Sequence, residues 1–455
     1  AVVLAREVIG TNGAEVAAGL LVLAGHNWPV FLQFKGGRGI LTALGGLALM
    51  VPAPAMPSVD SIVIVPEAIA TAEPAPMVAG AKQSSPSTGL STQDATGVVV
   101  MSEKQDEEIP VVAVVAKTVV DLDLADAEIP SSRILLDLAS QAEDSARAVS
   151  GVTNSEGAET SAGESAVTLA NSSGFAGGYR ATSFGISVSV IAGSDTQMER
   201  DYEYTSSRHF SDLEPASEIG KRAAERAVRR LDPKKVKSQQ VPVVFDPRLS
   251  GGFPRLLAGL ISGAAISRGT SILKDKMNEQ VFSQSINIID DPLRKRGLSS
   301  RPFDGEGVQG KSRNIVKDGV LTTWLLDTRS ARQLSLKTTG HAARSTSSPP
   351  SPGPTNLYML PGSVSPDELI ENIDDGFYIS EMMGMSFNSI TGDYSRGASG
   401  FWIKNGELIH PVNEMTVAGN VKDMFLEITP ANDLQFRYSV NAPTIRVDGM
   451  TVAGV

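Results

Sequence analysis

Cysteine is absent from this 455-residue chain, and histidine occurs only four times, as His26, His209, His341 and His410. The lack of cysteine excludes disulfides, thiolate metal sites and a cysteine nucleophile. No two histidines lie within five residues of each other, so no histidine pair can bind a metal from one face of a helix. The sequence therefore contains no local motif for a hydrolytic metal site.

Positive charge is also scarce. The chain has 40 Lys and Arg against 51 Asp and Glu, a formal net charge of −11. Its most basic segment, residues 221–237, mixes Lys and Arg with Glu225 along one predicted helix and its exit. We interpret this segment as a solvated helix face and expect no nucleic-acid partner. A hydrophobic content of 41% and a charged content of 20% are typical of a folded protein.

Residues 1–59 are apolar and glycine-rich. Between residues 16 and 34 the one ionisable side chain is His26, and residues 39–59 carry no charge. Each stretch has about the 20 residues that a membrane-spanning helix needs. We expect membrane contact only if residues 1–59 form a genuine apolar hairpin, and we do not expect a signal peptide, because the stretch is long and has no basic leader.

Residues 25–39, Gly-His-Asn-Trp-Pro-Val-Phe-Leu-Gln-Phe-Lys-Gly-Gly-Arg-Gly, resemble the membrane enzyme glycerol-3-phosphate acyltransferase (PlsY). In that family a Gly-Gly-Lys-Gly loop handles a phosphate, and Arg38 replaces the lysine here. Glycine amides and a cation can cradle an anion. Because the resemblance covers only a fragment of a multi-pass enzyme, we interpret residues 1–59 as a fused segment without chemistry, with an acyltransferase remnant as a remote alternative. Residues 60–130 are predicted to be a linker or a weakly structured region.

Hydrophobic periodicity predicts regular elements after Pro130. The predicted helices cover residues 131–149, 215–231, 249–266 and 420–428, and the predicted strands include residues 183–191, 197–204 and 241–245. In the second of these strands Met198, Tyr202 and Tyr204 alternate with Glu199, Asp201 and Glu203. Such alternation is typical of a half-buried strand, and the two runs at 183–191 and 197–204 predict an antiparallel hairpin.

Two dipeptides, Asp318-Gly319 and Asn405-Gly406, predict tight hairpins, because both positions of such a turn need a positive φ. Two copies of Met-Thr-Val-Ala-Gly, at residues 415–419 and 450–454, suggest repeated strand ends. Together the elements predict an α+β fold, strand-rich, with antiparallel sheets and a barrel-like C-terminal region.

Several smaller motifs have plain structural interpretations. Asp290-Asp291 before a proline is typical of a turn, with a carboxylate pair as the alternative. Asp123 is expected to face solvent on a strand. His341 begins a Pro/Ser-rich segment, residues 341–356, that we expect to be a mobile loop. His341 could then approach a site only on loop closure.

Residues 392–402 read Gly-Asp-Tyr-Ser-Arg-Gly-Ala-Ser-Gly-Phe-Trp and open a predicted hairpin. We consider this segment a candidate peptide-facing groove, or a turn that folds back on itself through an Asp–Arg pair. The candidate groove residues are Asp393, Tyr394, Arg396, Gly397 and Ser399.

From about residue 136 to its end, the chain resembles the TldD/PmbA family. The segments that carry the resemblance are residues 153–158, 169–180, 200–202, 302–308, 325–328, 355–358, 392–402 and 449–454. In the zinc-bearing members, the helix after the strand at 241–245 carries a His-Glu-x-x-x-His motif. Here that helix contains Leu-Leu-Ala-Gly-Leu-Ile-Ser-Gly-Ala-Ala at residues 256–265, which can neither bind zinc nor move a proton. We divide this part of the chain into a middle region, residues 131–235, and a C-terminal domain, residues 236–455.

The resemblance implies a cytoplasmic, hetero-oligomeric metallopeptidase that cleaves unfolded peptides, including peptide-antibiotic precursors and antitoxins. Without the motif, this chain resembles the PmbA-like (TldE-like) subunit, which has no catalytic or metal-binding residues. The zinc would then belong to a TldD-like partner, and an extended peptide would be the shared substrate. A stand-alone peptidase of the same family and a purely structural assembly protein remain open as alternatives.

Overall fold

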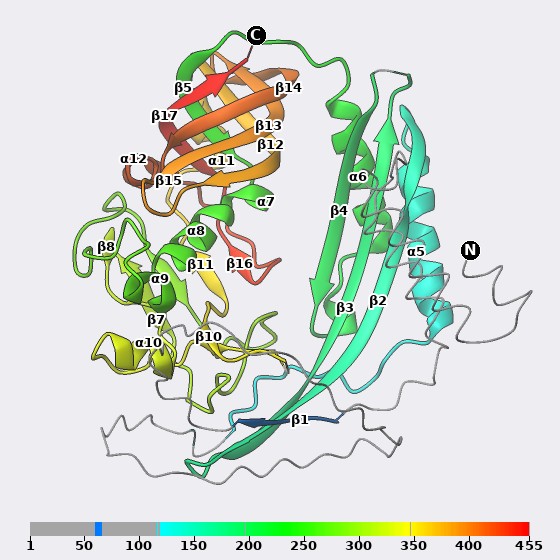
Figure 1. The fold of residues 1–455 in the computed structure, drawn as a ribbon. Helices are drawn as coiled ribbons and strands as arrows, with labels where there is room; N and C mark the ends of the chain where they lie inside the picture. Colours follow the sequence, from blue (N-terminus) through cyan, green and yellow to red (C-terminus); the bar gives the residue numbers. More distant parts are fainter. Residues whose placement is uncertain (1–59, 66–115, 117–118, 196, 346, 455) are drawn as a thin grey trace, which may run out of the picture. The chain divides into compact units, whose positions relative to one another are not determined.

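The computed structural model describes residues 60–65, 116, 119–195, 197–345 and 347–454 (Figure 1). The predictions for residues 1–59, including the apolar hairpin and the PlsY-like loop, lie outside these described residues. Among the helices that are described, none combines the length and the apolar character needed to cross a bilayer.

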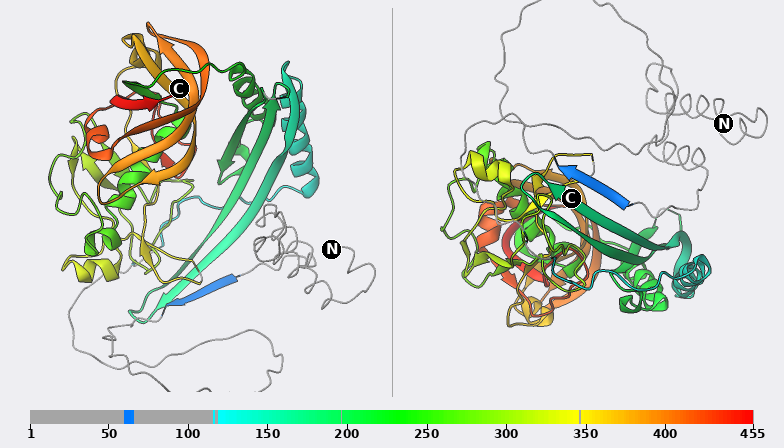
Figure 2. Two further views of the ribbon diagram at one scale, coloured as in Figure 1. Left: turned by 45° about the horizontal axis from the view of Figure 1, so that its top comes forward. Right: turned by 90° about the horizontal axis from the view of Figure 1, so that it is seen from below.

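The middle region, together with residues 60–65, forms a four-stranded sheet with two helices. Its strands, in sheet order, are β1 (Asp60–Val65), β2 (Val152–Asn171), β3 (Ala176–Ala192) and β4 (Glu199–Ser207). β1 pairs in parallel with β2, and the other pairs are antiparallel. Helices α5 (Ser132–Arg147) and α6 (Ala216–Arg229) lie side by side on one face of this sheet (Figures 1 and 2). The predicted helices and the hairpin of β3 and β4 are therefore present.

Small residues let α5 and α6 approach each other closely. Ala142 and Ala146 of α5 and Ala223 of α6 are completely buried. At Gly220 an added Cβ would lie 2.0 Å from the carbonyl oxygen of Ala142. A side chain at this position would force the helices apart, so the contact requires glycine. The N-terminal part of α5 is less buried, since Ile134 is exposed.

The C-terminal region contains a closed five-stranded barrel. Its strands, in order around the barrel, are β14 (Glu407–Asn420), β13 (Asp393–Lys404), β12 (Asp375–Phe387), β5 (Gln239–Phe245) and β17 (Ile445–Ala453). The pairing of β14 with β17 closes the barrel. A further short strand, β15 (Ile428–Pro430), pairs antiparallel with β17. The barrel-like prediction is thus confirmed. The two Met-Thr-Val-Ala-Gly segments lie in β14 and β17 and pair with each other, with Val417 opposite Val452.

A second sheet lies beside the barrel core. Its strand order is β16 (Val440–Asn441), β11 (Leu357–Met359), β6 (Ile288–Asp290), β7 (Arg313–Lys317) and β8 (Val320–Leu321). The strands β9 (Ala342–Ala343) and β10 (Ser351–Pro352) form a separate pair. Both predicted tight turns are present: φ is 49° at Asp318 and at Asn405, and 78° and 81° at the glycines that follow.

The helix predicted over residues 249–266 is instead three short helices. These are α7 (Pro247–Ser250), α8 (Gly252–Leu260) and α9 (Gly263–Ser267). The break before α9 follows from a tertiary contact, because the Gly263 amide donates to the carbonyl of Leu325 at 2.8 Å. The remaining helices are α10 (Thr328–Gln333), α11 (Pro366–Glu371), α12 (Val421–Leu426) and the 3-10 turn η1 (Phe210–Asp212). Asn420 caps α12, close to the predicted start.

Candidate functional site

A cleft of about 550 Å³ is lined by residues of β4, α7, α8, β12, β13 and the segment at 437–440. Four of its lining residues are arginines, and none is an aspartate or glutamate. The arginines are Arg248, Arg255, Arg396 and Arg437. This concentration of positive charge contrasts with the net charge of −11 of the whole chain. The cleft is much larger than a neighbouring cavity of about 90 Å³, and it borders α8.

The strand β4 buries its acidic side chains, not its apolar ones. Glu203 is 0% exposed and Asp201 3%, whereas Met198 is 56% and Tyr202 39% exposed. The acidic side chains therefore form the inner face of this alternating strand. The physical reason is the neighbouring helix α6, which presents arginines to the sheet.

The arginines of α6 match the spacing of the acids on β4. Arg222, Arg226 and Arg230 recur every four residues, a rise of about 6 Å along a helix, and alternate residues of a strand are about 6.8 Å apart. Arg226 binds Glu203, and Arg230 Nη2 lies 3.0 Å from Glu199. The solvated face predicted for residues 221–237 is thus wrong at Arg230, which is buried, whereas Arg222 and Arg226 are partly exposed and Lys221 is exposed as predicted.

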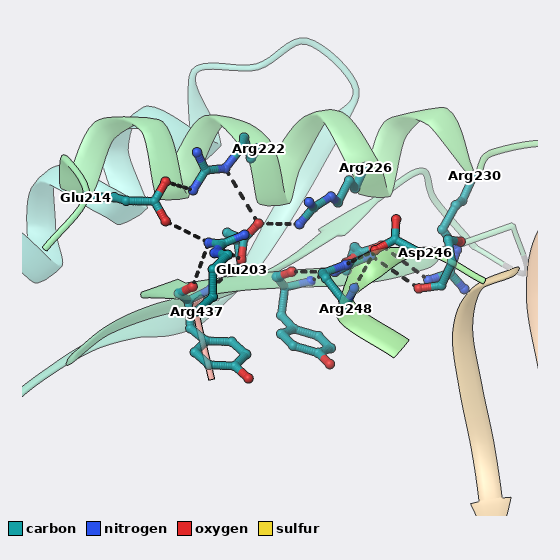
Figure 3. A network of polar contacts seen from close by, with 12 residues as sticks. Glu203, Glu214, Arg222, Arg226, Arg230, Asp246, Arg248 and Arg437 are labelled. Carbon is teal, nitrogen blue, oxygen red and sulfur yellow. Dashed lines mark hydrogen bonds and ion pairs between the residues drawn. The ribbon is translucent and has the colours of Figure 1, made fainter. Parts of the chain in front are cut away.

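Two arginines from the C-terminal region complete the network (Figure 3). Arg248 of α7 places Nη1 3.0 Å from Asp201 Oδ1. Arg437 places Nη2 3.2 Å from Glu203 Oε1 and 2.8 Å from Glu214 Oε1. The buried acids of β4 therefore form ion pairs both with arginines of α6 and with two arginines that line the cleft. Sequence reasoning missed this network, although the four-residue arginine spacing and the alternating acids were visible.

Side chains of the same network form hydrogen bonds with the backbone at the outer edge of β4. Within the described residues β4 pairs only with β3. The carbonyls of Tyr202 and Tyr204 accept hydrogen bonds from Arg248 and Arg437, each at 3.1 Å. Their amides donate to Asp201 at 2.8 Å and Glu203 at 2.9 Å. A peptide strand could add to this edge only by displacing these contacts.

Electrostatics keep the network ionised. Burial raises the pKa of Glu203, but the charges of Arg226 and Arg437 outweigh it and hold the pKa below its ordinary value. Burial lowers the pKa of Arg248, yet the carboxylates of Asp201 and Asp246 raise it overall. The cleft wall is therefore charged across the physiological pH range.

The five predicted groove residues all lie on β13, but only Arg396 lines the cleft. Its Nε donates to the carbonyl of Gly384 at 2.9 Å. Tyr394 is buried, with its hydroxyl 3.4 Å from Met382 Sδ.

The other predicted groove residues lie away from the cleft lining. Ser399 is buried and Gly397 is half-buried. Asp393 is exposed and accepts from Thr391 at 2.6 Å and Asn420 at 3.3 Å. Asp393 and Arg396 thus bind different partners, so the fold-back through an Asp–Arg pair does not occur.

His341 is buried rather than mobile. Its side chain is 2% exposed and lies 3.1 Å from Asp290 Oδ2, while its other ring nitrogen is 2.8 Å from Thr339 Oγ1. Asp290 ends β6 and also accepts two hydrogen bonds from Thr355, at 2.7 and 2.5 Å. The predictions of a mobile start for residues 341–356 and of a simple turn at Asp290 are wrong, because these side chains satisfy each other inside the core.

His209 forms a separate polar cluster. Its Nε2 lies 3.2 Å from Asp123 Oδ1, and Asp123 also binds Arg296 at 2.6 Å. Asp123 has a φ of 53° and lies outside any strand, which corrects the prediction for this residue.

The residues that border the cleft do not fit a zinc ion. α8 and its cap contribute Gly251, Gly252 and Arg255, which have no metal-binding side chain. Elsewhere among the described residues, no three His, Asp or Glu side chains gather in an arrangement that could hold a metal.

Comparisons with known proteins agree with this architecture. The PmbA/TldA metallopeptidase central domain matches residues 125–231, and the PmbA/TldA metallopeptidase C-terminal domain matches residues 238–454. Residues 1–74 match the glycerol-3-phosphate acyltransferase family, in agreement with the resemblance of residues 25–39.

Among curated proteins, metalloprotease PmbA of Escherichia coli O157:H7 is 38% identical over 336 residues, which cover 73% of each chain. A solved structure from Bacteroides thetaiotaomicron, described as a candidate modulator of DNA gyrase, is 28% identical with a TM-score of 0.69, covering 75% of this chain and 76% of that one. TldE of Thermococcus kodakarensis shares the fold, with a TM-score of 0.64 at 20% identity over 74% of this chain and 80% of that one. On this evidence the chain belongs to the PmbA/TldD metallopeptidase family.

Proposed function

We propose that this chain is the non-catalytic, PmbA-like (TldE-like) subunit of a TldD/TldE-type zinc metallopeptidase that cleaves unfolded peptides in the cytoplasm. In this proposal a TldD-like partner carries the zinc, which activates the attacking water when bound. The present chain completes the assembly and helps to hold an extended peptide. Peptide-antibiotic precursors and antitoxins are the substrate classes that the family resemblance suggests.

The observation that carries the proposal is the chemistry of α8. This helix follows β5 and borders the cleft, as expected for the metal-bearing helix of the peptidase subunits. The residues that it and its cap present to the cleft are two glycines and Arg255. No imidazole or carboxylate is available there to bind a metal or to accept a proton from water.

The shape and charge of the cleft support contact with a peptide. A cavity of about 550 Å³ is large enough for a few residues of an extended chain. Because the edge of β4 is already capped, backbone pairing at residues 202 and 204 is disfavoured, and side chains of the cleft would make the contacts instead.

Reconstitution tests the proposal. The chain is purified alone and together with a TldD-like protein from the same organism, and zinc content and hydrolysis of an unfolded peptide are measured for each preparation. We expect stable association, zinc bound by the partner, and peptidase activity only when the partner is present. Stoichiometric zinc and activity in the isolated chain would establish the stand-alone peptidase instead.

Crosslinking separates the proposal from a purely structural role. A peptide with a photoreactive residue is bound to the assembled complex and illuminated. Crosslinks on α8, β12 or β13 of this chain are expected. Crosslinks confined to the partner would favour the structural assembly protein.

A further inference from the structure

We propose that Arg255 and Arg396 form a carboxylate-binding site for the peptide that occupies the cleft. This inference rests on the proposed function for the class of ligand, an extended peptide. The carboxylate can come from the C-terminus of the peptide or from an Asp or Glu side chain. Both sources offer the same planar group, which a guanidinium binds through paired hydrogen bonds.

The four arginines of the cleft differ in what neutralises them. Arg248 is neutralised by Asp201 at 3.0 Å, and Arg437 by Glu203 at 3.2 Å and Glu214 at 2.8 Å. Arg248 and Arg437 also donate hydrogen bonds to backbone carbonyls of β4, so we assign them a structural role. Their charge is balanced within the chain.

The charges of Arg255 and Arg396 are not neutralised in this way within the described residues. In the described part of the chain neither forms an ion pair with a carboxylate, and the guanidinium of Arg255 makes no hydrogen bond. Arg396 uses Nε for the carbonyl of Gly384, a neutral acceptor. Two guanidinium groups that line one cleft without an acidic neighbour create a local positive potential that an anion from outside can relieve.

The first turn of α8 adds to this potential. Gly251 and Gly252 line the cleft at the N-terminal end of this nine-residue helix, where the helix dipole contributes partial positive charge. At Gly252 an added Cβ would meet nothing within 4 Å, so the cleft is open beside the backbone. The positive potential of the cleft comes mainly from the two arginines, and the N-terminal end of α8 adds to it.

A peptide carboxylate fits this site better than a polyanion does. The net charge of −11 repels nucleic acid along its whole length, whereas a single carboxylate responds mainly to charges within a Debye length of about 8 Å at physiological salt. Leu249, Leu298 and Val440 also line the cleft and offer apolar contacts to neighbouring peptide side chains.

Calorimetric titration of the full chain with three hexapeptides of one neutral sequence tests the site. The first has a free C-terminal carboxylate, the second is amidated, and the third is amidated with one internal Glu. All three are acetylated at the N-terminus. We expect at least one carboxylate-bearing peptide to bind ten-fold or more tightly than the neutral amide, and the preferred peptide identifies the source of the carboxylate.

Substitutions of single arginines test which side chains cause the preference for a carboxylate. Arg255→Gln and Arg396→Gln should each remove most of this ten-fold preference, while Arg133→Gln on the exposed start of α5 should leave it unchanged. Equal binding of the acidic and neutral peptides, no binding of any peptide, or a preference that survives both cleft substitutions would overturn the inference. Partner association and partner-dependent hydrolysis test the proposed function separately, so failure of the carboxylate preference alone leaves that function standing.

Discussion

Arg248 Nη1 lies 3.0 Å from Asp201 Oδ1, and through this contact α7 is tied to the buried face of β4. Arg248 also donates to the carbonyl of Ser380 on β12, at 3.2 Å, and its guanidinium lies over the Tyr202 ring at 5.7 Å. One side chain therefore connects the acidic strand, the barrel and the cleft. The stability of the cleft should accordingly depend on the buried ionic network.

Replacing Glu203 by Gln should destabilise the fold strongly. Glu203 is fully buried and faces Arg226, Arg222 and Arg437. Its loss removes the counter-charge of Arg226 and leaves Arg222 and Arg437 to share Glu214. We expect the free energy of unfolding, measured by urea denaturation, to fall by about 3 kcal/mol. Glu164→Gln is the matched control, because Glu164 pairs with Arg180 at an exposed site, and its loss should cost less than about 1 kcal/mol. Equal effects of the two substitutions would contradict the assigned role of the network.

The contribution of Glu203 should disappear in acid. Its pKa in the folded protein is lowered, because the arginine charges outweigh the effect of burial. A lowered folded pKa stabilises the fold above the unfolded value of about 4.3, and this stabilisation is lost as the pH falls through the folded pKa. The difference in unfolding free energy between the wild type and Glu203→Gln should thus be constant from about pH 5 to 7 and shrink below about pH 4. A difference that grows in acid would reverse the inferred sign.

Two glycines of β13 should respond very differently to alanine. A Cβ at Gly400 would lie 1.9 Å from the carbonyl oxygen of Tyr378, whereas at Gly397 its nearest neighbour would be 3.5 Å away. Gly400→Ala should therefore lower the unfolding free energy by about 2–3 kcal/mol, and Gly397→Ala by less than about 0.5 kcal/mol. Thermal unfolding of both variants checks this. A large loss at Gly397 alone would show that the packing of β12 against β13 is misassigned.

His341 should matter for stability and not for peptide cleavage. Its ring fills a buried site between Asp290 and Thr339, so His341→Ala leaves a cavity and removes one of the three hydrogen bonds to the buried Asp290 carboxylate. We expect a loss of about 2–4 kcal/mol in the free energy of unfolding. The half-buried His410 contacts the Pro411 carbonyl, and His410→Ala should cost less than about 1 kcal/mol. A His341→Ala complex that is fully stable but inactive would instead indicate a catalytic role.

Local sequence determined much of the architecture. The Asp-Gly and Asn-Gly turns and the helix after Asn420 formed as predicted, because each depends on contacts within a few residues. The strand at residues 183–191 also formed as predicted, because its strict alternation matches a sheet with one buried face. The absence of cysteine and of paired histidines likewise restricted the possible chemistry, because a chain cannot supply ligand types that its composition lacks. The family could be inferred from short motifs because each motif is a contiguous run of residues.

Tertiary structure alone decided which face of β4 is buried, the division of the helix predicted at residues 249–266 into three, and the composition of the cleft. The alternation of Tyr202 with Glu203 is the same whichever face is buried, and only the arginines of α6, Arg248 and Arg437 make the acidic face the inner one. Of the residues predicted for a groove, only Arg396 lines the cleft, whereas Tyr394, two residues before it, packs into the hydrophobic core. Burial of charge depends on partners far away in the chain, and periodicity within a segment carries no information about them.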